Sequence, residues 1–373
     1  MNALRALLPA LALLALLAPA APALDWERLP GVELALDLPP GPDNPRNSEG
    51  AFLPLKDGRI LFVYTKFTGG GGDHDTAFLA GRMSADGGKT WTAEDAVVLP
   101  NEGGMNIMSV SLLRMGSGDI GLFYLRKNSE QDCRPYLRVS SDEGATWGEP
   151  LCIVESPVSY YVVNNDRVVR LKSGRIVIPA ARHDWKGKRM DARAHMVCFL
   201  SDDDGATWRA SESVMYNKRV TLQEPGVVEL KDGRLMMFIR TDGGSQYLSW
   251  SDDGGSKWTE PVPGDLKSPL SPASIKRIPA TGDLLAVWND HEGIAPELAK
   301  ARTPVTAALS KDEGKTWTAR RNLSADPNGW YCYTALEFVD GQVLLGQCAG
   351  DRRQNGLART WVLRFPVGLL YGE

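Results

Sequence analysis

Short apolar runs separated by polar, glycine-containing turns follow one another along most of the chain. A run such as Arg59 to Val63 is only a few residues long and lies between turn signals, which is typical of β-strands. Apolar residues at helical spacing form no competing pattern, so a helical solenoid is excluded. The pattern predicts an all-β protein.

A hairpin signal recurs six times along the chain, at intervals of roughly 50 to 60 residues. Its glycines are Gly58, Gly118, Gly174, Gly233, Gly282 and Gly341. Two apolar runs joined by such a turn are expected to pair as an antiparallel β-hairpin. The spacing therefore predicts six similar units.

A second repeat, Ser-x-Asp-x-Gly-x-Thr-Trp or nearly so, follows five of these hairpins. Its copies begin at Ser84, Ser140, Ser201, Ser251 and Ser310. The Asp side chain can accept bonds from nearby backbone N–H groups, the Gly supplies a positive φ, and the Trp anchors the next strand. The acidic stretch 202–205 suggests a calcium loop, but it lacks the distal Glu of an EF-hand. We therefore interpret all five turns as structural.

Four strands per unit, with a hairpin between the first two and the Asp turn between the last two, match one blade of a propeller. Six units predict a six-bladed β-propeller with four-stranded antiparallel blades. The last unit lacks an Asp turn of its own. We expect the extended segment from Trp26 to Leu38 to supply its missing strand.

The repeated turn resembles the Asp-box, also called the bacterial neuraminidase repeat. The whole mature chain is similar to the six-bladed sialidases and their relatives. This resemblance implies a single sialidase-like propeller domain over residues 24–373. It indicates the fold more strongly than the function, because Asp-boxes also occur in non-enzymatic propellers.

Residues 1–23 differ from the rest of the chain. Arg5 precedes an apolar run from Leu7 to Leu17, and Ala21-Pro22-Ala23 provides the small residues that a signal peptidase cuts after. The run is too short to span a bilayer comfortably. We expect residues 1–23 to be a signal peptide and the mature protein to be secreted or periplasmic, with no membrane span after cleavage.

The charge balance argues against nucleic acid as a partner. The formal net charge of −4 becomes −5 once Arg5 is removed with the leader, and a mildly acidic chain binds nucleic acid poorly. Any anion site must therefore be a local cluster of basic side chains.

The five cysteines are an odd number without a Cys-x-x-Cys pair, so neither a disulfide-dense scaffold nor a zinc module is predicted. One or two disulfides remain open, with their pairing unassigned. The sequence has no His-Glu-x-x-His motif, phosphate loop or dinucleotide fingerprint. We therefore expect no metal and no cofactor. The sequence predicts no particular oligomeric state.

The ends of the second strands should gather near the propeller axis, on the face opposite the hairpin turns. The residues seven or eight positions after each hairpin Gly are Lys66, Arg126, Arg182, Arg240, Asn289 and Cys348. Arg302 begins a predicted third strand and Arg46 precedes a predicted first strand. Guanidinium groups bind carboxylates in a planar, bidentate way. The pattern predicts an arginine-lined pocket for an anionic ligand.

The resemblance to sialidases implies a carboxylate clamp of three arginines from the first, fourth and fifth blades. Arg46, Arg240 and Arg302 fall on those blades. The family's usual Arg-Ile-Pro opening is absent, and the segment 46–50 with Glu49 stands in its place. Glu49 also faces the predicted pocket and competes for an acid role. The starts of first strands add polar wall candidates, namely Asn106, Asn164, Asn165 and Asp166.

The resemblance further implies a tyrosine nucleophile with a glutamate as its base, because a tyrosine of ordinary pKa is a weak nucleophile. Glu224 lies nine residues before Gly233, and Tyr333 lies eight before Gly341, where the family places these residues. Tyr331 has the same strand parity and stays an alternative. Packing of the channel wall is the non-catalytic interpretation of both tyrosines.

The acid/base is expected on the glycine-rich loop from Gly69 to Asp75. Asp75 is the first candidate and Asp73 the alternative. The leading hypothesis is a retaining exo-glycosidase that removes a terminal sialic acid or related 2-keto sugar acid from glycans. A hydrolase of another acidic sugar, such as a uronate or a Kdo-like acid, is an alternative. A propeller that binds glycans without cleaving them is a third hypothesis.

Overall fold

The computed structural model describes residues 29–187 and 189–372, and these residues form β-sheets joined by turns and short loops. They also include two short 3-10 helices, η2 (Pro296–Leu298) and η3 (Val367–Tyr371). Within the described residues, no helix has the length and apolar character needed to cross a membrane. The all-β prediction is confirmed.

Four sheets of the described chain are four-stranded and antiparallel. The first contains β2 (Arg46–Pro54), β3 (Ile60–Phe67), β4 (Ala77–Ser84) and β5 (Ala96–Leu99). The second contains β17 (Leu222–Glu229), β18 (Leu235–Thr241), β19 (Ser245–Ser251) and β20 (Val262–Lys267). The third contains β21 (Ser274–Arg277), β22 (Leu284–Trp288), β23 (Val305–Ser310) and β24 (Thr318–Ser324). The fourth contains β25 (Gly329–Val339), β26 (Gln342–Asp351), β27 (Thr360–Pro366) and β1 (Glu33–Leu38).

Nine further strands form one larger sheet, because two neighbouring units are joined by a strand pairing. It contains β6 (Asn106–Arg114), β7 (Ile120–Ser129), β8 (Asp132–Ser140), β9 (Leu151–Cys152), β10 (Tyr160–Val162), β11 (Val169–Arg170), β12 (Ile176–His183), β15 (His195–Ser201) and β16 (Arg209–Ala210). The link is a parallel pairing of β10 with β8 through Tyr160 and Cys133. A separate hairpin pairs β13 (Trp185–Lys186) with β14 (Arg189–Met190).

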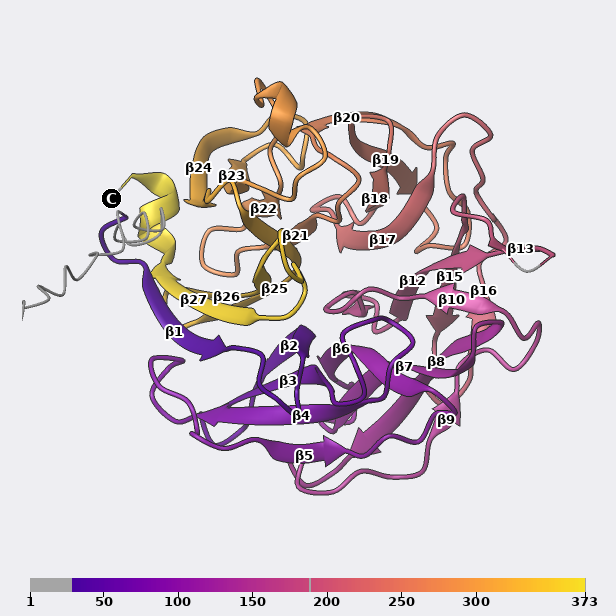
Figure 1. Ribbon diagram of the computed structural model, residues 1–373. Helices are drawn as coiled ribbons and strands as arrows, with labels where there is room; N and C mark the ends of the chain where they lie inside the picture. The colour runs from indigo at the N-terminus through magenta and orange to yellow at the C-terminus, as the bar shows by residue number, and fades with distance from the viewer. Residues whose placement is uncertain (1–28, 188, 373) are drawn as a thin grey trace, which may run out of the picture.

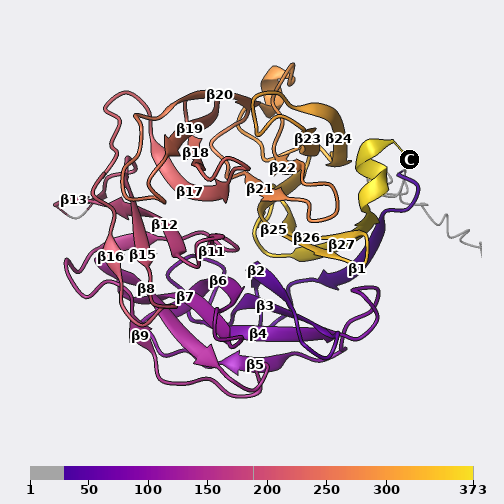
Figure 2. The same ribbon diagram turned by 180° about the vertical axis from the view of Figure 1, so that it is seen from behind.

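The sheets form a ring that the chain follows in order, from β2 round to β27 (Figure 1). Strands β2, β6, β17, β21 and β25 lie innermost, and the same ring is seen from behind in Figure 2. This radial arrangement of antiparallel sheets is that of a β-propeller. Apolar side chains pack between neighbouring sheets, as where Leu61 and Val63 meet Ile107 and Leu122. The ring leaves its inner strand ends free to carry a site.

The chain closes the ring by pairing its two ends. Strand β1 runs antiparallel to β27, with Leu38 opposite Thr360. This confirms the predicted missing strand for Glu33–Leu38, whereas Trp26 and the predicted signal peptide lie outside the described residues. Strand β1 thus completes the fourth position of the last sheet.

The repeated Asp turns have the bonds predicted from their sequence. In the first copy, Ser84 Oγ donates to Asp86 Oδ1 at 2.9 Å and Gly88 N donates to Ser84 Oγ at 2.9 Å. Equivalent bonds recur in the other four copies. Among the described residues there is no cluster of side chains suited to a metal ion. The bonds within each turn therefore account for its repeated Ser, Asp and Gly residues.

Acidic residues beside three of the turns tie neighbouring units together. The carboxylate of Asp204 accepts from the backbone N–H groups of Gly116 and Ser117, at 2.7 and 2.8 Å. Glu143 and Glu313 accept in the same way from Lys56 N and Lys231 N. In the stretch 202–205, Asp204 thus binds the hairpin of the preceding unit.

Candidate active site

Four inner strands are bulged where they face the ring axis. The register shifts lie at Ser48/Ala51 in β2, Met108/Ser111 in β6, Gln223/Gly226 in β17 and Cys332/Ala335 in β25. Each bulge holds one non-glycine residue at positive φ, namely Glu49 (59°), Ser109 (60°), Glu224 (44°) and Tyr333 (53°). A bulge changes the direction in which a side chain points. All four side chains line the same cavity.

This cavity has a volume of about 360 Å³ and carries charged, polar and aromatic groups. Its carboxylates belong to Glu49, Asp73 and Glu224, and its cationic side chains to Lys127, Arg240 and Arg302. Tyr160, Trp330 and Tyr333 supply aromatic surface. A concave site that combines charged and polar groups with aromatic walls is suited to a small polar ligand such as one sugar ring.

Tyr333 and Glu224 are brought to one cavity wall from strands more than a hundred residues apart in sequence. Glu224 Oε1 accepts a hydrogen bond from Arg240 Nη1. Its Oε2 is buried and has no hydrogen-bond partner among the described residues. Burial and then the negative charge of Glu224 raise the pKa of Tyr333. The phenol is therefore protonated at neutral pH, with a carboxylate oxygen available in the same cavity.

The alternative tyrosine lies on the other side of the strand. Tyr331 is 2% exposed and packs in the hydrophobic core, with its ring centroid 6.3 Å from that of Trp361. It lines a different cavity, on the outer side of β25. The register of the bulged strand therefore places Tyr333, and not Tyr331, in the wall of the central cavity.

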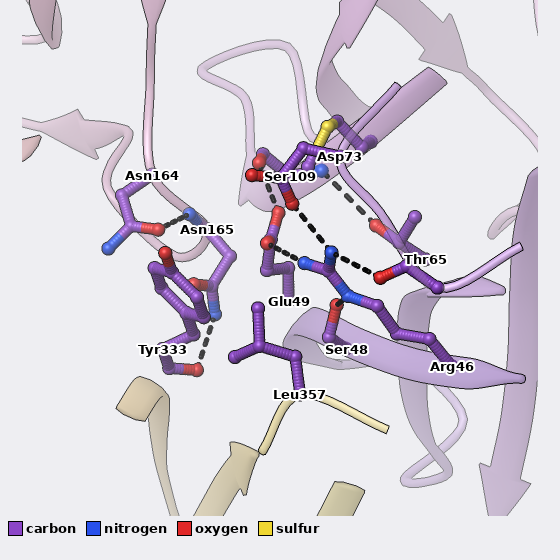
Figure 3. A network of polar contacts seen from close by, with 12 residues as sticks. Arg46, Ser48, Glu49, Thr65, Asp73, Ser109, Asn164, Asn165, Tyr333 and Leu357 are labelled. Carbon is purple, nitrogen blue, oxygen red and sulfur yellow. Dashed lines mark hydrogen bonds and ion pairs between the residues drawn. The ribbon is translucent and has the colours of Figure 1, made fainter. Parts of the chain in front are cut away.

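Asn165 holds the backbone that carries Tyr333. Its Nδ2 donates to Tyr333 O at 3.0 Å (Figure 3). The same nitrogen donates to Gly50 O at 2.7 Å. Asn165 is fully buried and lies behind the cavity wall, whereas its neighbour Asn164 lines the cavity. The predicted substrate-binding residue Asn165 is thus placed to position two bulged strands.

The three predicted clamp arginines have different surroundings. Arg302 and Arg240 line the cavity. The guanidinium of Arg302 lies over the rings of Trp330 and Tyr333, at 5.2 and 5.3 Å from their centroids. Arg302 forms no ion pair with a carboxylate in the described part of the chain, and Arg240 pairs with Glu224. Two of the three arginines therefore face the cavity.

Arg46 is buried behind the cavity, at 1% exposure. Its Nη2 donates to Glu49 Oε1 at 2.8 Å and its Nη1 to Asp73 Oδ1 at 2.5 Å (Figure 3). Its guanidinium also stacks on Phe67, at 4.3 Å from the ring centroid. The structure does not bring Arg46 to the cavity wall with Arg240 and Arg302. It makes Arg46 the counter-ion of two cavity carboxylates.

Those two carboxylates respond differently to their surroundings. Burial raises the pKa of Glu49 despite its bond to Arg46. Burial also acts to raise the pKa of Asp73, but the charge and hydrogen bond of Arg46 outweigh it and lower that pKa. Two neighbouring carboxyl groups whose pKa values are pushed apart are suited to separate acid and base roles.

The glycine-rich loop places Asp73, and not Asp75, in the cavity wall. Asp75 Oδ2 accepts from Gly72 N at 2.8 Å and so closes a turn within its own loop. Asp73 is anchored by Arg46 and by two donors to its backbone oxygen, Asn106 Nδ2 and Lys127 Nζ. Of the two acid/base candidates, Asp73 is the one next to the other site residues.

Arg126 and Arg182 lie on the outer side of their strands. Arg126 stacks over Tyr136 at 5.3 Å, and Arg182 Nε lies 3.8 Å from Asp184 Oδ1. The next residue along each strand, Lys127 or His183, lines the cavity instead. Side chains alternate along a strand, so a displacement by one residue reverses the face.

Sequence reasoning missed Lys127 and His183 because it counted eight residues from the hairpin glycine in these strands, and both lie nine residues from it. Arg240 lies seven residues from its glycine, which gives the same parity. Lys127 is buried beside the ring of Tyr160. His183 Nδ1 lies 2.9 Å from Asp191 O, and burial lowers the pKa of this imidazole. Both residues are found by counting an odd number of residues, seven or nine, from the hairpin glycine.

Comparison with known proteins matches a family described as a BNR repeat-like domain over residues 67–344. A sialidase of Bacteroides fragilis is 28% identical over 221 residues, which are 56% of this chain and 38% of that protein. An anhydrosialidase of the leech Macrobdella decora is 27% identical over 281 residues, covering 66% of this chain and 34% of that protein. The chain thus spans about a third of the length of these curated relatives.

Solved structures share the fold over most of the chain. A leech intramolecular trans-sialidase superposes with a TM-score of 0.72 at 15% identity, covering 92% of this chain and 71% of that one. A Dyadobacter fermentans protein of unknown function gives a TM-score of 0.70 at 19% identity, covering 90% of this chain and all of that one. The chain therefore belongs to the BNR repeat-like domain family, within the sialidase superfamily.

Proposed function

We propose that this chain is a retaining exo-glycosidase of the sialidase type that removes a terminal acidic sugar from glycans. The observation that carries the proposal is the placement of Tyr333 and Glu224, by two separate bulges, in the wall of one cavity. A binding protein would need neither a phenol nor an unpaired carboxylate oxygen at such strained positions. The sialidase relatives at low identity support the same class of reaction.

In the proposed reaction the phenol oxygen of Tyr333 attacks the anomeric carbon, and Glu224 takes up the phenol proton. The bond to the leaving oxygen breaks as that oxygen receives a proton from the acid. Water then releases the sugar from the tyrosine with the reverse proton transfers. A neutral nucleophile avoids repulsion from an anionic sugar, and sialidases are an exception to the rule of two carboxylates for this reason.

We assign the acid/base role to Asp73. It lies at the rim of the cavity, with its side chain 56% exposed, so a leaving group extending from the cavity can reach it. Arg46 lowers the pKa of Asp73, so Asp73 needs a neighbouring source for the proton that it delivers. Glu49 shares Arg46 with Asp73 and has a raised pKa, and we propose that it holds this proton and passes it to Asp73. The geometry thus favours Asp73 over Asp75 for protonation of the leaving oxygen.

Arg302 and Arg240 are proposed to bind the sugar's carboxylate. Lys127 of β7 is a further cation in the cavity wall. Arg302 has the strongest claim because its charge faces the cavity without an ion pair among the described residues. The occupation of Arg46 by Glu49 and Asp73 favours a second candidate substrate class, a uronate or Kdo-like sugar held by fewer arginines. We also propose that the ring has six blades, with the nine-stranded sheet counting as two, and that the protein is exported.

Release of sugar acid from an aryl sialoside and a panel of glycans tests the function. Tyr333→Phe should lower kcat by at least about a thousandfold, because the phenyl ring cannot form the glycosyl bond. Tyr331→Phe is the matched control on the same strand and should keep activity. Unchanged turnover by Tyr333→Phe would remove the phenol from the reaction. A panel that releases only uronate or Kdo-like acids would select the second substrate class.

A further inference from the structure

Two cysteines face each other across the strands behind the cavity. Cys332 of β25 and Cys348 of β26 are direct register partners, and both are buried free thiols. Directly opposed residues of antiparallel strands have Cα atoms about 4.5–5.5 Å apart and side chains on the same face. That separation lies within the range of about 4.4–6.8 Å that a disulfide requires. The backbone is therefore already placed for a bond.

The surroundings of the two thiols make them chemically unequal. Cys332 and Cys348 face each other in the strand register, and the positive charge of Arg302 acts on Cys332. Burial acts to raise the pKa of Cys332, but its interactions with the Cys348 thiol and with the charge of Arg302 outweigh burial and lower that pKa. Burial raises the pKa of Cys348. Cys332 is thus the thiol suited to attack and Cys348 the one suited to resolve.

We propose that Cys332 and Cys348 form a disulfide directly behind the cavity wall that carries Tyr333 when the chain folds in an oxidising medium. The Cys332 sulfur attacks a low-molecular-weight disulfide such as oxidised glutathione, whose S–S bond breaks and releases one thiol. Cys348 then attacks the mixed disulfide at Cys332 and releases the second thiol. The two cysteine protons end on the two small thiols, and the small disulfide is the oxidant.

The bond would constrain the segment that positions the proposed nucleophile. Cys332 immediately precedes Tyr333 and lies at the start of the β25 bulge. A disulfide to β26 would restrain the bulge that carries Tyr333, in addition to the bond from Asn165. It would also replace the Cys332 thiol, whose pKa the charge of Arg302 lowers, by a disulfide sulfur. The pair therefore links the redox state of the medium in which the chain folds to two residues of the cavity wall.

The other three cysteines provide internal controls. Cys133, Cys152 and Cys198 belong to β8, β9 and β15 of the nine-stranded sheet, away from β25 and β26 (Figure 1). None of them is a register partner of another cysteine in the described strands. A bond specific to the proposed pair leaves these three thiols free.

The test uses the full chain, unfolded and refolded in a mixture of oxidised and reduced glutathione, because both thiols are buried in the folded state. Remaining thiols are alkylated with N-ethylmaleimide under denaturing conditions, and the peptides are mapped by mass spectrometry. We expect one cross-linked species joining the peptides of Cys332 and Cys348, lighter by two hydrogens than their sum. Cys133, Cys152 and Cys198 should be alkylated. Refolding with a strong reductant should leave all five cysteines alkylated.

Variants and melting curves test the same bond independently. Oxidised protein should melt about 4 °C above reduced protein, from closure of a short loop in a chain of this size. Cys332→Ser should remove both the cross-link and this difference, whereas Cys152→Ser should keep both. Five alkylated cysteines after oxidative refolding, or a cross-link through Cys133, Cys152 or Cys198, would overturn the proposal. The peptide map of the unaltered chain decides this even if a variant fails to fold.

Discussion

Replacement of Arg46 by methionine tests how the cavity is organised. Arg46 is 1% exposed and bonds to Glu49, which is 4% exposed, and to Asp73 at the rim. Methionine keeps much of the side-chain volume over Phe67 but removes the positive charge. Arg46→Met would therefore leave the Glu49 carboxylate buried without its counter-ion. If Arg46 instead served mainly to contact ligand, stability in the absence of ligand would change little.

The size of the effect follows from burial. Removing one partner of a buried ion pair costs about 3–5 kcal/mol, and the Arg46–Glu49 pair meets that description. Asp73 is more than half exposed, so solvent screens its ion pair, which should add at most about 1 kcal/mol. We expect Arg46→Met to lower the free energy of unfolding by about 4 kcal/mol at neutral pH.

The loss should depend on pH in a definite direction. Burial already raises the pKa of Glu49 above its ordinary value of 4.5, and removal of Arg46 raises it further. A carboxyl group with a raised folded-state pKa holds its proton more tightly in the folded state, so the penalty is absent below the unfolded pKa. The penalty grows as pH rises from about 4.5, the ordinary pKa of the carboxyl group, to the raised pKa of Glu49 in the folded state. Arg46→Met should therefore differ least from the unaltered protein at acid pH.

Urea unfolding followed by tryptophan fluorescence, at pH values on both sides of this interval, measures the effect. Arg126→Met is the matched control, because Arg126 lies on the outer side of its strand and stacks on Tyr136, and it should cost about 1 kcal/mol or less. Equal stability of the two variants at pH 8 would refute the role of Arg46 as the buried counter-ion.

Three further predictions concern positioning, proton transfer and acid stability. Asn165→Ala should lower kcat about tenfold with little change in KM, because the backbone oxygen of Tyr333 loses its hydrogen-bond donor. Replacement of the exposed Asn322 by alanine is the control, and a rise in KM alone would contradict the prediction. Asp73→Asn should reduce turnover of alkyl glycosides about a hundredfold more than that of activated aryl glycosides, whereas Asp75→Asn should not discriminate between them. Hydrogen bonds lower the pKa of four turn aspartates from 3.8 to about 2, namely Asp86, Asp142, Asp203 and Asp312. Their contribution to stability is therefore present above pH 3.8 and lost as pH falls towards 2. Acid titration followed by circular dichroism measures this loss.

The β-sheet framework could be predicted because its turns are determined by local chemistry. Gly58 and Gly233, at two of the six predicted hairpins, adopt positive φ, as do the glycines of the other four. The Asp turns likewise contain their own hydrogen-bond partners within a few residues. The ring-closing strand was predicted from a different kind of signal, the absence of an Asp turn in the last unit.

The cavity could be predicted less well because it depends on strand register. Reading eight residues from a hairpin glycine indicated Arg126 and Arg182, and the side chains facing the cavity are one residue further along. The choice between Asp73 and Asp75 depends on the path of a glycine-rich loop, which residue spacing does not determine. The role of Arg46 depends on where Glu49 points after a bulge. Each of these features arises from pairing between segments and not from a local motif.

The bulged positions give an independent argument that the cavity is functional. Glycine would occupy positive φ at lower cost, because a non-glycine residue held there is strained by about 1–3 kcal/mol. The chain instead places Glu49, Ser109, Glu224 and Tyr333 at such positions, in four different sheets. Their side chains converge on one cavity, so the strain is tied to what these groups present there. A ring that needed only to be stable could have used glycine at each of them.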